Sequence, residues 1–293
     1  METTPMASPP WEKLPPEIAA AILHKLGAVE ILTTAQKVCP TWRRVSLEPS
    51  MWRCIKMEHS RATGRLYDLK KMCRHAVDLS RGQLTDITIH SFCTNDLLLY
   101  ISQRSIQLSR LCLQDCHDIG GDALTAALKN LPLLEELHLQ NSSFDVKAIE
   151  TVGRYCPLLK SFKLNSDVFD PEEACDLEAL AIAENMHGLR HLELYGNKMT
   201  NVGLKAILEG CPNLESLDLR RSINVDLVGD LERLCLQRIK DLKLPHNYTR
   251  RYPWDTHYDM FCIWADVSDS EDDFFADGDS ASDCDDDVFV YLR

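Results

Sequence analysis

The sequence predicts a mixed α/β fold: a small helical module near the amino terminus, then a solenoid of parallel strands and helices, then an acidic tail. Three observations lead to this prediction. Apolar residues recur at intervals of 24 to 30 residues over most of the 293-residue chain. Before these repeats, residues 11–57 carry apolar stripes at helical spacing, and after them the chain becomes strongly acidic.

The repeating unit has the pattern L-x-x-L-x-L, followed three positions later by a small polar residue or a cysteine. It begins at residues 84, 108, 134, 159, 189, 214 and 239. This length and pattern are typical of leucine-rich repeats. Alternate residues of a strand point to opposite faces, so the leucines of x-L-x-L-x should form the core. The rest of each unit indicates a helix, for example at 123–128, 148–152 and 203–208.

A helix is wider than a strand, so a stack of such units should bend. We expect a horseshoe with parallel strands on its concave face and helices on its convex face. The longest interval contains residues 169–174, which we interpret as a surface insertion.

Residues 11–57 indicate short helices in place of repeats. Prolines 15 and 16 open the first helix, where proline is tolerated because the first N–H groups have no partner within the helix. A second apolar stripe covers 31–38, Pro40 ends it, and Trp42 begins a third. So few helices cannot bury their apolar faces alone and should dock on a partner. The apolar residues that share one face of the first helix are Ile18, Ile22, Leu23 and Leu26.

The order and spacing of the motifs in this module resemble the F-box. The matching segments are Leu14-Pro15-x-Glu17-Ile18, Ile22-Leu23-x-x-Leu26, Val38-Cys39-x-x-Trp42-Arg43 and Pro49-x-x-Trp52-Arg53. The alternative, a helical cap on the solenoid, does not account for this order. The repeats resemble the cysteine-containing repeats of F-box proteins, since 156–159 and 211–214 carry the junction Cys-Pro-x-Leu, although 131–132 and 187–188 depart from it. The chain is thus similar to plant F-box/leucine-rich-repeat proteins.

This resemblance implies a substrate-recognition adaptor of a Skp–cullin–F-box ubiquitin ligase. The F-box would dock on the Skp adaptor and through it on a cullin, and the repeats would bind a protein targeted for ubiquitination and proteasomal degradation. The chemistry would belong to other subunits, so we expect a non-catalytic chain without a cofactor. The alternative is a non-catalytic repeat scaffold for protein–protein interaction outside a ubiquitin ligase. The implied adaptor contacts or their support are Leu14, Pro15, Ile18, Ile22, Leu23, Leu32, Val38 and Trp42.

Strand residues that do not face the core should form the concave face. At ~4.8 Å per strand, seven strands span roughly 30 Å, which is enough for a protein partner. Glu193 and Asp218 should be neighbours there; either a basic group of the substrate pairs with them, or each pairs with an adjacent lysine, 163 or 243. The predicted substrate-binding residues are Lys163, Glu193, Tyr195, Asp218 and Arg220.

Composition argues against several other classes of protein. Eleven acidic residues and no Lys or Arg lie between 266 and 287; without them the net charge of −13 falls to −2, so no basic face for nucleic acid is expected. No apolar run approaches the ~18 residues of a membrane helix, and residues 1–10 do not resemble a secretory signal. We therefore expect no membrane partner and a location in the nucleus or cytoplasm. Twelve cysteines should be reduced and mostly buried.

Two further features lead to expectations about metal and about the tail. Cys112, Cys116 and His117 could suggest zinc, but Cys112 belongs to a repeat strand, so we expect no metal site. We expect aromatic residues between 248 and 264 to cover the last repeat, and the residues beyond 266 to be disordered through charge repulsion. Serines 268, 270, 280 and 282 precede acids by three residues; a phosphorylation switch and a plain solvating tail are the alternatives.

Together these patterns divide the chain into four parts. They are an F-box at 11–57, a helical connector and N-terminal cap at 58–83, a leucine-rich-repeat domain at 84–250, and an aromatic cap with an acidic disordered tail at 251–293.

Overall fold

The computed structural model describes residues 11, 14–59, 67–141, 144–166 and 174–245, all of which lie in one compact unit, Met1–Arg251. The unit begins with short helices. Prolines occupy the first turn of α1 and of α3, where a missing N–H costs nothing. These elements are α1 (Pro16–Leu23), α2 (Ala28–Thr33), the 3-10 helix η2 (Ala35–Lys37), α3 (Pro40–Ser46) and the 3-10 helix η3 (Pro49–Trp52).

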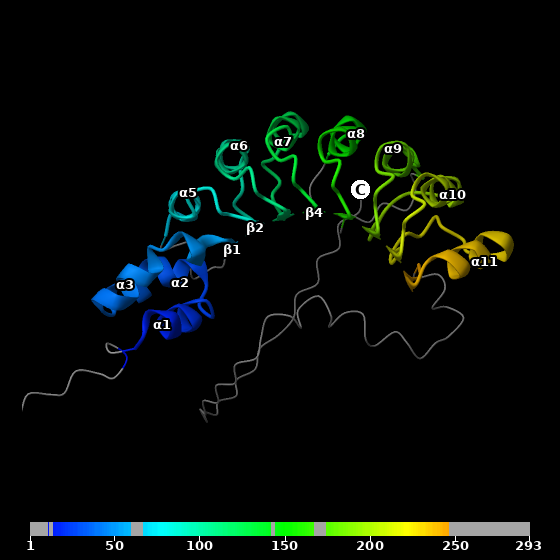
Figure 1. The fold of residues 1–293 in the computed structure, drawn as a ribbon. Coiled ribbons are helices and arrows are strands. Elements are labelled where there is room, and N and C mark those ends of the chain that lie inside the picture. The colour runs from blue at the N-terminus through cyan, green and yellow to red at the C-terminus, as the bar shows by residue number, and fades with distance from the viewer. Residues whose placement is uncertain (1–10, 12–13, 60–66, 142–143, 167–173, 246–293) are drawn as a thin grey trace, which may run out of the picture. The chain divides into compact units, whose positions relative to one another are not determined.

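Parallel strands form one eight-stranded sheet, in which each strand pairs with the next along the chain. Helices connect successive strands and lie together on one side of the sheet (Figure 1). The strands are β1 (Cys54–Glu58), β2 (Asp86–His90), β3 (Arg110–Gln114), β4 (Glu136–Gln140), β5 (Ser161–Asn165), β6 (His191–Glu193), β7 (Ser216–Asp218) and β8 (Asp241–Lys243). The helices are α5 (Leu69–Leu79), α6 (Asn95–Arg104), α7 (Gly121–Leu128), α8 (Val146–Tyr155), α9 (Leu177–Asn185), α10 (Asn201–Gly210) and α11 (Gly229–Arg238).

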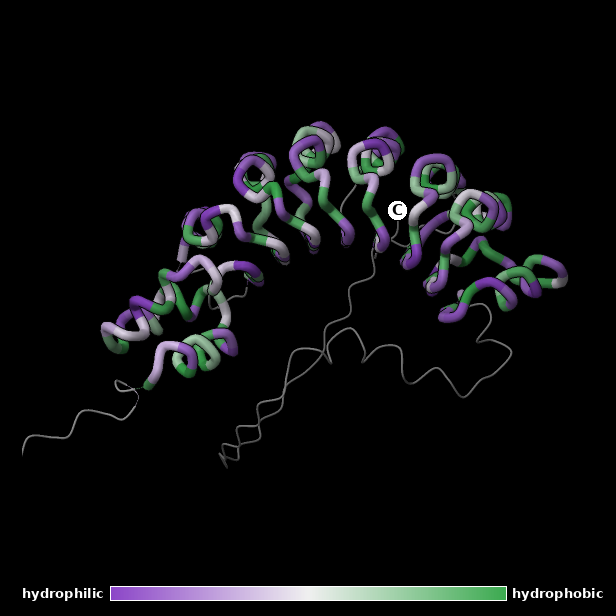
Figure 2. The backbone as a smooth tube through the Cα atoms, viewed as in Figure 1, coloured by the Kyte–Doolittle hydropathy of each residue, from purple (hydrophilic) through white to green (hydrophobic). Residues whose placement is uncertain are grey.

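The core lies between the sheet and the helices. Strands β1, β2 and β4 alternate buried and less buried residues, and the buried positions include Ile87 and Ile89 on β2. On β3 and β5 the residues Cys112 and Ser161 are buried as well. Hydrophobic segments alternate with hydrophilic ones along every repeat (Figure 2). The helices also pack closely on one another. Gly210 at the end of α10 lies against the backbone of Ala183 in α9, so that any Cβ at position 210 would clash with its carbonyl.

The fold class and all seven expected strands are confirmed, and the structure adds one strand that the sequence did not predict. β1 pairs with β2 in register, from Cys54 opposite Asp86 to Glu58 opposite His90. Its inward residues are Ile55 and Met57, which do not carry the leucine pattern. This strand therefore crosses the predicted limit between residues 57 and 58, and the limits of the four parts remain predictions. Within 58–83 the connector contains helix α5, as expected.

Three expectations fall outside the described residues. The proposed surface insertion at 169–174 does so except for Ala174. The aromatic segment at 248–264 and the acidic tail beyond 266 do so entirely.

Candidate protein-binding surfaces

Helix α1 has two apolar sides that face different ways. Ala19 and Leu23 are fully buried inside the helical module. Ile18 and Ile22, one helical turn apart, are 49% and 37% exposed. The sequence placed Ile18, Ile22 and Leu23 on one face of the helix, and this prediction is wrong. Ile22 and Leu23 are consecutive residues, so their side chains point about 100° apart around the helix axis. An apolar side is thus left at the surface.

A hollow lies between α2 and α3. Val38, between η2 and α3, is 40% exposed and lines it together with Leu32 and Gln36. Two buried side-chain donors of this region, Gln36 Nε2 and Trp42 Nε1, have no hydrogen-bond partner among the described residues. By contrast, Nε1 of the neighbouring Trp52 donates to the carbonyl of Ser46 at 2.8 Å. A buried donor without an acceptor costs about 1–3 kcal/mol.

We call the exposed side chains of Ile18, Ile22 and Val38 the α1–α3 apolar face. The predicted adaptor residues lie on or beside this face to different degrees. Pro15 is exposed with Ile18, Ile22 and Val38, whereas Leu23 is buried and can act only as support. The remaining three are partly buried: Leu14, Leu32 and Trp42.

The side of the sheet away from the helices forms the concave face of the repeats. Its central column has one residue from each strand and begins with Lys56 of β1. The paired positions are Lys56, Thr88, Cys112, His138, Lys163, Glu193, Asp218 and Lys243. The five positions on β4 to β8 are all charged residues or histidine, so these polar residues are contiguous in the column.

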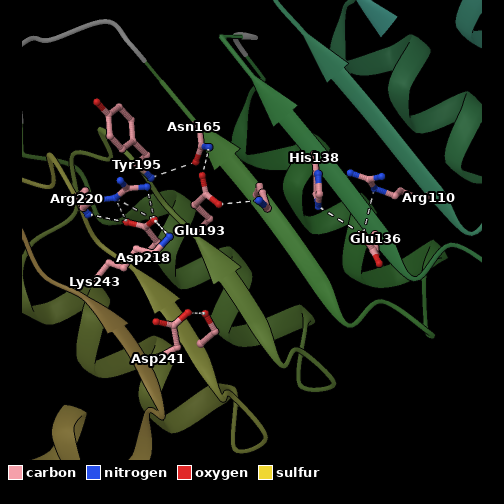
Figure 3. A network of polar contacts seen from close by, with 12 residues as sticks. Arg110, Glu136, His138, Asn165, Glu193, Tyr195, Asp218, Arg220, Asp241 and Lys243 are labelled. Carbon is pink, nitrogen blue, oxygen red and sulfur yellow. Dashed lines mark hydrogen bonds and ion pairs between the residues drawn. The ribbon is translucent and has the colours of Figure 1, made fainter. Parts of the chain in front are cut away.

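The two neighbouring acids of this column are paired within the chain (Figure 3). Lys163 Nζ lies 2.9 Å from Glu193, and Lys243 Nζ lies 3.3 Å from Asp218. Arg220 adds a two-pronged interaction with Asp218, through Nε at 3.0 Å and NH2 at 2.8 Å. Of the two alternatives left open by the sequence, the structure shows pairing with the adjacent lysines.

The Asp218 carboxylate is the most buried charge of this network, with its side chain 6% exposed. Burial raises its pKa, but the hydrogen bonds from Arg220 and the charges of Arg220 and Lys243 outweigh burial and hold the pKa below its usual value. The group is therefore ionised at neutral pH. Its role is to fix the positions of the two basic side chains.

Tyr195 and the two arginines after β7 form a cluster at the end of the strands. The guanidinium groups of Arg220 and Arg221 lie 5.7 Å and 5.4 Å from the ring centroid of Tyr195, within cation–π range. Arg221 also donates to the Tyr195 hydroxyl at 3.3 Å. Arg221 has φ of +60°, a conformation that is unfavourable for a residue with a Cβ. The sequence did not predict a role for Arg221, because its position depends on this backbone turn.

Farther toward β2, the concave face contains buried polar atoms that are unpaired. His138 Nε2 is buried without a hydrogen-bond partner among the described residues and lies 3.8 Å from Glu136, too far for a hydrogen bond. Burial, with the charges of Lys163 and Arg110, lowers the pKa of His138 to about 3, so its ring is neutral at neutral pH. Arg110 lies between Asp86 and Glu136, at 3.1 Å and 3.3 Å. Its Nε nevertheless donates no well-directed hydrogen bond.

A polar hollow of about 370 Å³ spans the concave face from β4 to β8. It brings together three of the predicted substrate-binding residues, Lys163, Glu193 and Asp218, and leaves Tyr195 and Arg220 outside its lining. Lys243, which the sequence indicated as a possible ion-pair partner of an adjacent acid, also lines it. The sequence did not single out the remaining polar residues of the hollow, although their place in the strand pattern could have identified them. They are Glu136, His138, Ser161, His191, Ser216 and Asp241.

The described part of the chain has neither a membrane-spanning helix nor a cluster of metal-ligating side chains. None of its helices has the length and apolarity needed to cross a membrane. Nor do its His, Cys, Asp and Glu side chains gather in threes in a way that could hold a metal ion.

Comparison with known proteins identifies relatives along most of the chain. An F-box-like family model matches residues 11–58. The F-box protein SKIP19 of Arabidopsis thaliana is 48% identical over 264 residues, which cover 90% of this chain and 82% of that protein. The putative F-box/LRR-repeat protein 22 of the same plant is 42% identical over 266 residues, covering 90% and 86%. A crystal structure of the Rad7 and Elc1 complex in yeast superposes with a TM-score of 0.45 at 15% identity, covering 78% of this chain and 67% of that one, a likeness too weak to carry an argument.

Proposed function

The chain belongs to the family of F-box proteins with leucine-rich repeats, and we propose that it is the substrate-recognition subunit of a Skp–cullin–F-box ubiquitin ligase. In this role the F-box binds a Skp adaptor and through it a cullin. The repeats hold a protein substrate for ubiquitination and proteasomal degradation. The observation that carries the proposal is the α1–α3 apolar face, which leaves Ile18, Ile22 and Val38 exposed on the F-box.

One physical argument supports adaptor binding at this face. Exposed isoleucine and valine side chains favour association, since burying apolar area is stabilising by roughly 25 cal/mol per Å². We assign contacts to Leu14, Pro15, Ile18, Ile22, Leu32, Val38 and Trp42, and support to Leu23.

The concave face is the proposed substrate surface. Lys163, Glu193, Asp218 and Arg220 are held by mutual ion pairs, and Tyr195 is held between arginines. Side chains that are already fixed lose little conformational entropy on binding. Tyr and Arg are also the residue types that most often dominate interface energy. We therefore propose these five residues as a pre-organised protein-binding patch.

The chain's part in the ligase is to bind, with ubiquitin transfer carried out by other subunits. We infer no cofactor, no nucleic-acid partner and no membrane partner, and a location in the nucleus or cytoplasm. This follows from the family and from the near neutrality of the chain outside residues 266–287. The competing function is a repeat scaffold that acts without a cullin, and it predicts that no bound protein becomes ubiquitinated.

Co-expression of the full chain with a Skp adaptor and a cullin tests the proposal. The wild type should co-purify with both, and the double variant Leu14→Ala/Pro15→Ala should lose both. Circular dichroism must show that the repeats of the variant remain folded. Failure of folded wild type to recover the adaptor would reject the ligase role and favour the scaffold.

A further inference from the structure

A groove of about 400 Å³ lies where the F-box meets the sheet, between the turn after α1 and strand β1. Its floor is apolar and includes the buried side chains of Ile31, Met51 and Trp52. Its rim carries two exposed lysines, Lys25 of the α1–α2 turn and Lys56 of β1. The groove is thus a hydrophobic trough with cationic edges.

The charges around this groove differ from those of the rest of the concave face. From β5 to β8, the lysines of the central column form ion pairs with acids of the same chain. Lys25 and Lys56 form no ion pair with any other described residue, and no acidic side chain lines the groove. Exposed His24 also lies on the rim. A positively charged rim attracts negative groups, most strongly at low salt.

The groove is continuous with the proposed substrate surface and separate from the proposed adaptor surface. Lys56 heads the same column of the sheet as His138 and Lys163. Neither Ile18 nor Val38 of the α1–α3 apolar face lines it. A protein bound on the concave face could therefore reach the groove while an adaptor occupies the F-box.

We propose that this groove binds an acidic peptide segment of the protein held by the repeats, with an apolar side chain on the floor and carboxylates beside Lys25 and Lys56. The inference rests on the proposed function, because the peptide belongs to the substrate. It adds the chemistry of that substrate: one large apolar residue flanked by Asp or Glu. A neutral or basic segment would gain nothing from the rim.

Fluorescence anisotropy with the full-length chain tests the charge and the anchor separately. The probe is a fluorescein-labelled peptide, Gly-Glu-Asp-Leu-Phe-Asp-Glu-Gly. One comparison peptide replaces its acids by Gln and Asn, and another replaces Leu-Phe by Gly-Gly. We expect saturable binding of the probe, weakened at least several-fold between about 50 and about 300 mM salt, and binding about tenfold weaker for each comparison peptide.

Two variants test the location. Lys25→Ala/Lys56→Ala should weaken the probe about tenfold. Gly27→Tyr should fill the groove, because a Cβ at this exposed lining residue meets no atom within 4 Å and its φ of −70° is ordinary. The matched control is Gly120→Tyr, at another helix start with the same open surroundings and φ of −88°, and it should bind the probe like the wild type.

Three results of the peptide experiments alone would overturn the inference. They are an absence of saturable binding by the wild type up to about 200 μM chain, equal binding of the neutral peptide, and wild-type binding by both groove variants. Adding the Skp adaptor distinguishes this inference from the proposed function. If the adaptor displaces the probe, the groove belongs to the adaptor surface and the inference is also overturned. If the adaptor binds the wild type and all variants while the probe binds none of them, the inference is rejected and the ligase role stays intact.

Discussion

Replacing Ile18 and Ile22 together by alanine should weaken the binding of a Skp adaptor about thirtyfold. Full burial of an isoleucine side chain stabilises by roughly 2.5 kcal/mol. The two residues are 49% and 37% exposed, so docking can bury about half of that surface at Ile18 and a little over a third at Ile22. The combined loss is about 2 kcal/mol, or about 1.5 decades in Kd.

The assay is surface plasmon resonance with immobilised Skp adaptor, together with thermal unfolding of each variant. Because the lost atoms are exposed in the free chain, the melting temperature should stay near that of the wild type. The control is Leu133→Ala/Leu158→Ala, which truncates two leucines of the repeats that are each 45% exposed and should leave adaptor binding unchanged. Adaptor affinity of the Ile18/Ile22 variant within threefold of wild type would refute the assignment of this face.

Three further predictions concern the repeats. Gly210→Ala should lower the free energy of unfolding by about 1–3 kcal/mol, because its Cβ would clash with the Ala183 carbonyl; Gly120→Ala, with open surroundings, should unfold in urea like the wild type. The Asp218 carboxylate, whose pKa is lowered from 3.8 in the folded chain, stabilises the fold above that pH and loses this contribution as pH falls through its folded pKa. The stability difference between wild type and Asp218→Asn should therefore shrink in acid titrations below about pH 4, and a constant difference would contradict the pairing. Burial raises the pKa of Cys211 to about 11, so mass spectrometry should find it unmodified by iodoacetamide at pH 8 in the folded chain and modified in urea.

The internal pairing of the concave face has a consequence for recognition. Each basic residue of the patch at Lys163 and Arg220 is already neutralised by an acid of the same chain. A substrate bound at this proposed patch would be selected by fit and hydrogen bonding, since net charge offers little long-range attraction. Lys25 of the α1–α2 turn and Lys56 of β1, which form no ion pair with another described residue, provide an electrostatic contrast that would favour one direction of binding.

The architecture of the repeats could be predicted from residue order because it depends on local periodicity. A leucine at alternate positions has to face the core, and repeats of nearly constant length place each strand in register with the next. The columns running through Cys112, His138 and Lys163 follow directly from that rule. The F-box could be predicted because its motifs occur in a fixed order and spacing. Strand β1 could not, since Ile55 and Met57 lack the leucine signature and their burial depends on pairing with β2.

By itself, the sequence determined seven of the eight strands, their order and which strand residues share a face, because these are set by spacing along one chain segment. Tertiary structure alone decided how neighbouring side chains use that face. It paired Lys163 with Glu193, and it buried Leu23 while leaving Ile22 exposed. It also placed Lys25 and Lys56 on the rim of one groove. These outcomes depend on distances between segments far apart in sequence, and on competition among partners within a few ångströms, neither of which is encoded in any local pattern.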